Sequence, residues 1–428
     1  MKNPMVKKHM VVVGGGITGV TSAYALAQQG FQVTLIEKNR YPGMETSYAN
    51  GGQLSASNAE VWTHPSTIIK GIKWMLKSDA PLLMNPAPTW HKLSWMAEFV
   101  AAIPKYKDNT IATAQLAIES REHHFAWAKA EGIDFDHKRE GILHIYRDKK
   151  GFDHAGEVSK LLAQGGLPRR AVTPEEMKAI EPTLQGQYYG GYFTESDSTG
   201  DIHKFTFGLA QACERLGVNI LTEHQVLNVQ SNGQTASVQV QHQGQTDTLS
   251  FDGIVICAGV HGRKLAAQLG DRLNIYPVKG YSITVNMPEA ASQAAAPQVS
   301  LLDDETKLVT SRLGDDRFRV AGTAEFNGID LDIRADRIQP LVNWVNECFP
   351  GIDTRRVVPW AGLRPMMPNM LPRVGAGKKA NVFYNTGHGH LGWTLSAITA
   401  HQLAGHVLQG MGHNVRSFAT PVTAPAAA

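Results

Sequence analysis

The chain has 428 residues, of which 43% are apolar and 18% charged. This is the composition of an ordinary globular protein, with length for two or three domains. The formal net charge of +3 is too small to indicate a nucleic-acid partner. Because Cys213, Cys257 and Cys348 are far apart and form no CxxC motif, we expect neither a disulfide framework nor a metal site. This cysteine usage suits a reducing compartment.

The first residues resemble the charged region of a signal peptide, since Lys2, Lys7 and Lys8 precede an apolar run. That run covers only residues 10–13 before glycines interrupt it, so it is too short for a signal peptide. The sequence also has no stretch of about 20 uninterrupted apolar residues. We therefore expect a cytoplasmic protein, associated at most peripherally with the inner face of the membrane.

Residues 9–37 show the order strand, glycine turn, helix, strand. The turn contains Gly14, Gly16 and Gly19 in the spacing G-x-G-x-x-G, and Glu37 ends the second strand. In this context the glycines permit a tight turn, close approach of a pyrophosphate and close helix packing, while the acid binds ribose hydroxyls. The motif predicts a dinucleotide site, against the alternative of a tight turn without a ligand.

Residues 62–110 read as irregular and rich in Trp, Pro and Lys. Three lysines in this segment fall roughly on one helix face and alternate with large apolar side chains. They indicate either a membrane-surface patch or a solvated face beside core aromatics. The residues are Lys70, Lys73, Lys77, Trp74, Met75, Trp90 and Trp95.

The segments that follow alternate in type. Residues 111–131 predict an amphipathic helix, 141–148 a strand, and 172–182 a helix with Thr173 as N-cap and Pro174 at its first position. A second α/β passage at 203–260 resembles the rest of a nucleotide-binding sheet, with a helix, a strand and a buried strand at 205–217, 218–229 and 252–259. Further on, strands dominate 275–325 and a helix is expected at 332–349.

A second glycine turn, at Gly387, Gly389 and Gly392, again lies between a predicted strand and helix within 381–408. No acid follows it, so it is not an independent dinucleotide site. It predicts a helix N-terminus whose N–H groups face the N1–C2=O edge of a flavin, against packing alone. His388 and His390 within it are candidates for acid–base groups or for hydrogen-bonded packing.

Residues 361–428 contain no Asp or Glu, which suits a segment that lines an anionic cofactor and substrate. Arg364, in the constrained sequence AGLRPMMP, is suited to a bidentate grip on a carboxylate. A structural ion pair is the alternative. The tail at 416–428 is rich in Ala, Pro and Thr, and we expect it to be disordered.

The motifs VVVGGGITGV, ETSYANGGQLS, GIKWMLKSDAPL, PVKGYSITV, AGLRPMMP and NTGHGHLGWT together resemble the small subunit of bacterial D-amino acid dehydrogenase, in the D-amino acid oxidase group of flavoproteins. The resemblance runs to about residue 410. It implies an α/β fold in which a glutathione-reductase-like FAD-binding Rossmann domain is interleaved with a mixed-sheet substrate domain. It also implies that FAD is held without a covalent bond.

The resemblance further implies the site residues. Arg364 corresponds to the arginine that binds the substrate carboxylate, and Lys279 and Tyr281 match positions on the sheet that faces the flavin. The cofactor residues are expected at the first turn, along a loop beside the flavin, at the adenine and at the second turn. They are Gly14, Gly16, Ile17, Thr18, Gly19, Glu37, Lys38, Thr46, Ser47, Asn50, Gly51, Gly52, Gln53, Val226, Gly259, Gly387, His388, Gly389, His390, Leu391, Gly392, Trp393 and Thr394.

We expect two discontinuous domains, one for FAD at 1–90, 200–270 and 360–415, and one for substrate at 91–199 and 271–359. The predicted reaction is oxidative deamination of a D-amino acid by hydride transfer to flavin N5, with electrons passed to a quinone or another acceptor. Two alternatives stay open. One is another amine substrate, such as hydroxyproline, a secondary amine or an L-amino acid. The other is a non-catalytic flavin-binding protein.

Overall fold

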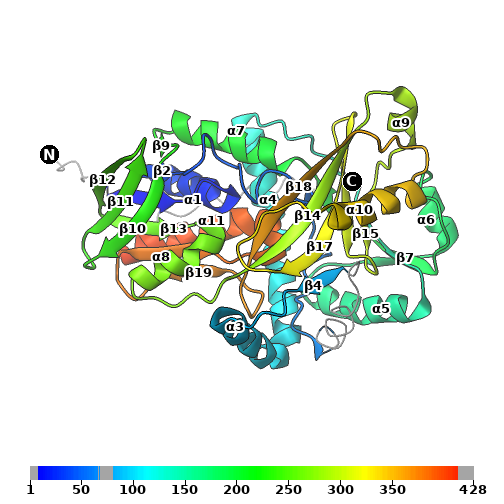
Figure 1. Cartoon of the computed structure of the whole chain (residues 1–428), viewed down its shortest axis with the longest axis horizontal. Coiled ribbons are helices and arrows are strands. Elements are labelled where there is room, and N and C mark those ends of the chain that lie inside the picture. The colour runs from blue at the N-terminus through cyan, green and yellow to red at the C-terminus, as the bar shows by residue number, and fades with distance from the viewer. Residues whose placement is uncertain (1–7, 66, 68–80, 413–428) are drawn as a thin grey trace, which may run out of the picture.

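The computed structural model describes residues 8–65, 67 and 81–412, and two large sheets lie side by side along its long axis (Figure 1). The first has six strands in the order β19-β20-β13-β1-β2-β9, parallel except for the β19–β20 pair. These strands are His9–Val13 (β1), Gln32–Ile36 (β2), Asn219–Leu221 (β9), Gly253–Ile256 (β13), Arg373–Ala376 (β19) and Val382–Thr386 (β20).

Both faces of the six-stranded sheet are covered, so its central strands are mostly apolar. Val12 packs against three helices on one face, while Val11 and Val13 pack against a three-stranded sheet and α8 on the other. The three helices are Ile17–Gln28 (α1), Ile202–Arg215 (α7) and Gly392–Gly410 (α11). The second layer consists of Gln225–Ser231 (β10), Ala236–His242 (β11), Gln245–Phe251 (β12) and Gly262–Gln268 (α8).

The second large sheet has nine strands and mixed direction, in the order β18-β14-β17-β16-β15-β5-β7-β6 with β4 beside β17. Helix α10 (Ala335–Cys348) covers one face, where Leu341 and Trp344 pack against Ile283 and Val320. The strands are Leu82–Met84 (β4), Ile142–Tyr146 (β5), Arg170–Val172 (β6), Gly190–Thr194 (β7), Tyr276–Asn286 (β14), Ser300–Asp303 (β15), Leu308–Leu313 (β16), Arg317–Phe326 (β17) and Val357–Met366 (β18).

Short elements join and flank the two sheets. A two-stranded ribbon of β3 and β8 lies between them, and α4 packs against α11. The predicted N-cap of α6 is confirmed, and it forms a capping box in which Thr173 and Glu176 each bind the other's backbone N–H. These elements are Gln53–Leu54 (β3), Ser198–Thr199 (β8), Tyr106–Glu131 (α4), Lys149–Gln164 (α5), Pro174–Ile180 (α6) and Ala290–Ala295 (α9), with 3-10 turns at Ile103–Lys105, Gly259–His261 and Gly389–Leu391.

The expectation that residues 62–110 are irregular is wrong in its second half. Helix α3 spans Trp90–Ala101, with the Thr89 hydroxyl accepting a hydrogen bond from the Lys92 N–H at 3.2 Å. Trp95 and Phe99, one turn apart, are its buried face, whereas Trp90 is 82% exposed. Lys70, Lys73, Lys77, Trp74 and Met75, and the tail at 416–428, lie outside the described residues.

The strand predicted at 218–229 is in fact two strands in different sheets. The chain breaks at Glu223, whose φ of +58° turns it from β9 into β10. The expected FAD domain also included residues 81–90 and 360–415, but β4 and β18 belong to the nine-stranded sheet. A boundary drawn from the sheets therefore falls after Met366.

Across residues 8–65, 67 and 81–412, no helix is long and apolar enough to cross a membrane.

Candidate active site

A cavity of about 500 Å³ opens at the carboxyl ends of the parallel strands, between the two large sheets, where α/β sheets bind their ligands. Every residue proposed for the cofactor from the sequence lines this cavity except Gly19. Arg364 lines it as well, at the end formed by the nine-stranded sheet. The fold thus brings residues from five distant parts of the chain to one site.

The three glycines of the first turn have different neighbours. A Cβ on Gly14, where φ is +105°, would lie 2.7 Å from the Cys257 carbonyl oxygen, and a Cβ on Gly19 would overlap the Gly14 carbonyl oxygen. At both positions the protein's own backbone therefore leaves no room for a side chain. A Cβ on Gly16 would meet only Ser47 Oγ, at 3.5 Å. The space at Gly16 is therefore left for a ligand.

Glu37 closes the strand end beside this turn. Its Oε2 accepts a hydrogen bond from the Gly15 N–H at 2.7 Å, and its Oε1 accepts one from the Asn39 N–H at 2.8 Å. Burial raises the pKa of this carboxyl, against the lowering effect of these N–H donors. The arrangement holds an acceptor at the position where a dinucleotide ribose lies in such folds.

The loop at 46–53 connects the two halves of the cavity. Ser47 Oγ accepts from the Ile17 N–H at 2.9 Å, and the Thr46 hydroxyl donates to the Leu363 carbonyl at 2.9 Å. Gln53 Nε2 donates to Ser300 Oγ at 2.8 Å, but its Oε1 is buried and has no hydrogen-bond partner among the described residues. The loop thus ties α1 to the nine-stranded sheet and presents an unused acceptor.

The second glycine turn leads into α11, with φ of +80° at Gly387 and +60° at Gly389. His388 Nε2 lies 3.0 Å from the Thr399 hydroxyl, and burial lowers its pKa to about 3. His390 stacks on Trp62 with ring centroids 5.0 Å apart, and burial lowers its pKa to about 4. Both imidazoles are therefore neutral near pH 7, so neither supplies a cation to the site.

Arg364 lies at the end of the cavity that the nine-stranded sheet forms. Its Nη1 donates to the Thr323 carbonyl oxygen at 2.8 Å, and burial lowers its pKa to about 10. Among the described residues no carboxylate lies within 4.0 Å of this guanidinium. Burying a cation without an ion-pair partner costs free energy because the charge loses its hydration. An anion that enters the cavity and pairs with the guanidinium would offset this cost. The structural ion pair considered as an alternative role is not formed.

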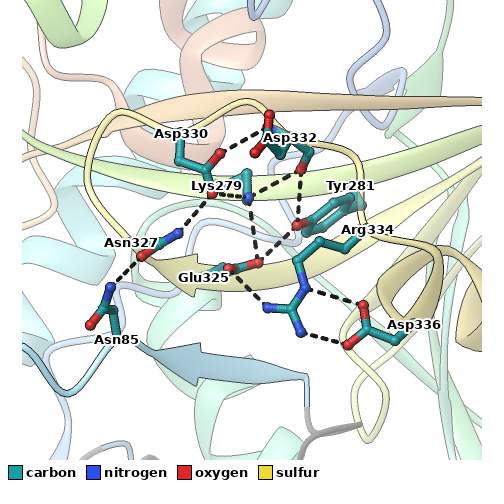
Figure 2. A network of polar contacts seen from close by, with 9 residues as sticks. All are labelled: Asn85, Lys279, Tyr281, Glu325, Asn327, Asp330, Asp332, Arg334 and Asp336. Carbon is teal, nitrogen blue, oxygen red and sulfur yellow. Dashed lines mark hydrogen bonds and ion pairs between the residues drawn. The ribbon is translucent and has the colours of Figure 1, made fainter.

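Lys279 and Tyr281 lie on the sheet that borders the cavity, as expected, but their polar groups point away from it. Strand β14 alternates, so Gly280 faces Arg364 and its two neighbours point to the opposite face. There Lys279 Nζ binds Asp330 Oδ2 at 2.6 Å, and the Tyr281 hydroxyl donates to Glu325 Oε2 at 2.9 Å (Figure 2). Tyr281 borders the cavity wall, but its hydroxyl is committed to this cluster.

Thr323 and Gly280 are site residues that sequence reasoning did not single out. Thr323 has a φ of +58° inside a strand, and its buried Oγ1 has no hydrogen-bond partner in the described part of the chain. Only the glycine inside the predicted strand at PVKGYSITV gave a signal, because a strand glycine marks close approach of another group. The unusual backbone of Thr323 has no signature in the sequence.

The residues present fit a flavin dinucleotide. Gly16 leaves room at the helix N-terminus, and Glu37 offers acceptors for ribose. Elsewhere in the cavity, four buried polar atoms of lining residues have no partner in the described protein: Gln53 Oε1, Thr323 Oγ1, His390 Nδ1 and Trp393 Nε1. Such atoms are expected to find partners when a site is filled.

The chain belongs to the FAD dependent oxidoreductase family, whose sequence profile matches residues 9–405. It therefore has the FAD-binding α/β fold that its motifs predict. Over 395 residues it is 60% identical to D-amino acid dehydrogenase 3 of Mesorhizobium japonicum, covering 92% of this chain and 96% of the relative. It is 39% identical over 403 residues to D-amino acid dehydrogenase of Dechloromonas aromatica, with 92% and 96% covered. The predicted resemblance to these dehydrogenases is confirmed.

Solved structures share the fold at lower identity. Glycine oxidase from Geobacillus kaustophilus superposes with a TM-score of 0.75 and 21% identity, covering 94% of this chain and 95% of that one. L-proline dehydrogenase from P. horikoshii has a TM-score of 0.72 and 17% identity, covering 95% and 94%. These neighbours support the two-sheet architecture.

Proposed function

We propose that this protein is an FAD-dependent D-amino acid dehydrogenase. It removes a hydride from Cα and a proton from nitrogen, and water hydrolyses the resulting imine to a 2-oxo acid and ammonia. The observation that carries the proposal is Arg364, a buried guanidinium facing the cavity with no carboxylate within ion-pair distance in the described protein. The D-amino acid class is supported by the relatives named above.

The protein's own groups bind and orient the substrate. Arg364 holds the carboxylate, and this fixes the direction of the Cα–H bond. Bound FAD would supply the hydride acceptor at its N5 atom. The positive end of α11, beginning at Gly392, faces the cavity and favours negative charge there. Trp62 and Trp360 are apolar parts of the wall and limit the access of water.

The first experiment is anaerobic mixing of the holoenzyme with paired D- and L-amino acids, followed by flavin absorbance. We expect bleaching by D-alanine and not by L-alanine. If only the L-enantiomer, hydroxyproline or another secondary amine bleaches the flavin, the substrate is not a D-amino acid and belongs to that other class. Absence of bleaching by every amine would leave a non-catalytic flavoprotein.

We also propose that electrons leave to a quinone and that the reduced enzyme reacts slowly with oxygen. Only one complete dinucleotide fingerprint occurs, at 14–19, so a second nucleotide site for NAD(P)H is not expected. The lysine-rich segment at 70–77 supports peripheral attachment to an anionic membrane. Stopped-flow reoxidation by oxygen at least as fast as turnover with a quinone analogue would make the protein an oxidase. Equal sedimentation with neutral and anionic vesicles would remove the membrane proposal.

FAD is proposed to bind without a covalent bond, since no cysteine lines the second glycine turn. Acid precipitation of the yellow holoenzyme should release intact FAD into the supernatant. Flavin that remains with the denatured chain would contradict this.

A further inference from the structure

The polar cluster behind Arg364 occupies the face of the nine-stranded sheet opposite the cavity. It contains Lys279, Tyr281, Glu325, Asp330 and Arg334 (Figure 2). Lys279 is fully buried, and its Nζ also lies 3.8 Å from Glu325 Oε2. Buried charges are expensive to keep in a folded protein, so a cluster this close to the substrate site needs an explanation.

The cluster holds an irregularity in β17. Lys279 is paired with Glu325 and Tyr281 with Gly322, so two residue steps on β14 oppose three on β17. The extra residue makes a β-bulge, and Thr323 within it adopts a φ of +58°, which a β-branched residue rarely accepts. Such a backbone persists only where its surroundings over-determine it.

Side chains on the far face hold β17 beside the bulge, in addition to the pairing of Ala324 with Leu82 of β4. The Tyr281 hydroxyl donates to Glu325 Oε2 at 2.9 Å, two residues after Thr323. Lys279 Nζ then binds Asp330 Oδ2 at 2.6 Å and the Asp332 carbonyl at 3.2 Å. The end of β17 that follows the bulge and the chain that leaves it are therefore both tied to β14.

The bulge meets Arg364 on the cavity face. It turns the Thr323 carbonyl toward Arg364 Nη1, at 2.8 Å, and this is the one hydrogen bond to the guanidinium that the described residues provide. Gly280 lies between the two residues that anchor the bulge, and a Cβ there would come 2.5 Å from Arg364 Cζ. The guanidinium is thus held by the bulge on one side and by the bare backbone of β14 on the other.

We propose that Tyr281, Lys279 and Glu325 are positioning residues that act through the Thr323 bulge to set the orientation of Arg364 for a carboxylate ligand. The assignment of the ligand as a D-amino acid rests on the function proposed above, but the orientation of Arg364 does not. A carboxylate that lacks an amine, such as acetate, is therefore the appropriate probe.

The test is a double-mutant cycle on the FAD-loaded enzyme, with acetate affinity measured from the change in flavin absorbance. Tyr281→Phe removes the hydroxyl that holds Glu325, and we expect acetate to bind about tenfold more weakly while FAD content is unchanged. In an Arg364→Lys background the same change should have little further effect. Asp336→Asn is the matched control, because Asp336 contacts the cluster only through the exposed side of Arg334.

Equal tenfold losses in both backgrounds, or unaltered acetate affinity with a lower melting temperature, would show a structural role and overturn the proposal. If Tyr281→Phe does not fold, Glu325→Gln provides the same comparison with its volume preserved. The KM for D-alanine should rise in parallel with the acetate constant, with a smaller change in kcat. Wild-type enzyme that binds acetate but oxidises none of the D-amino acids tested would refute the proposed function and leave this inference standing.

Discussion

Arg364 is the residue that we propose binds the substrate carboxylate. Replacement by lysine keeps a positive charge but removes the planar fork that matches a carboxylate. We expect Arg364→Lys to lower kcat/KM for a D-amino acid by about 2–4 kcal/mol in transition-state stabilisation, with FAD content near normal. Steady-state kinetics with a dye acceptor measure this. An unchanged kcat/KM would remove Arg364 from the site.

Gly280 is predicted to be as sensitive as Arg364 although it has no side chain. An alanine methyl there would lie 2.5 Å from Arg364 Cζ, so the guanidinium must shift. Misplacement by about 1 Å costs about a hundredfold in rate, and we expect a loss of that order in kcat/KM. Gly405→Ala, in α11 with no atom within 4 Å of the added methyl, is the matched control. Similar kinetics for the two variants would contradict the geometry.

At the scale of elements, two glycines of the β1–α1 turn are expected to serve different roles, one in cofactor binding and one in folding. Gly16→Ala adds a methyl with no protein atom closer than 3.5 Å, so the apoprotein should melt normally while FAD affinity falls, because the methyl takes the space of the pyrophosphate. Gly19→Ala overlaps the Gly14 carbonyl and should destabilise the apoprotein itself by about 1–3 kcal/mol.

Thermal melting of the two apoproteins and titration with FAD distinguish these effects. If Gly16→Ala lowers the melting temperature as much as Gly19→Ala does, the space at Gly16 is a packing requirement of the protein.

Elements with strong local signals could be predicted from the sequence. The βαβ unit at 9–37 and the capped helix α6 depend on glycine spacing and on Thr173, which act within a few residues. Helix α3 was missed because prolines at 86 and 88 directly precede it and obscure the Trp95/Phe99 spacing. The face of β14 that meets the cavity could not be predicted either, since period-two alternation does not say which side a ligand occupies.

For the whole molecule, several buried histidines make stability depend on pH. Burial lowers the pKa of His124 and of His390 to about 4, and that of His388 to about 3. Below the ordinary value near 6.5 the unfolded chain takes up protons that the folded chain refuses, so stability falls as pH drops from 6.5 toward 4. Each such histidine should cost about 2 kcal/mol at pH 5.

Calorimetry between pH 5 and 8 measures this dependence. His124→Asn should reduce the slope of melting temperature against pH, because one of these protons is removed. A melting temperature that does not change over this range would contradict the inference.

The order of strands in the six-stranded sheet also has a consequence for biosynthesis. β1 pairs with β2 and β13, and β13 pairs with β20 at residues 382–386. The glycine turn that precedes α11 follows directly on β20. On the ribosome, the nascent chain therefore carries half of the cofactor cradle for most of its synthesis, and pairings of such long sequence separation form late. FAD can stabilise this protein only after the strand at 382–386 has emerged, so cofactor supply governs the last step of maturation and not the first.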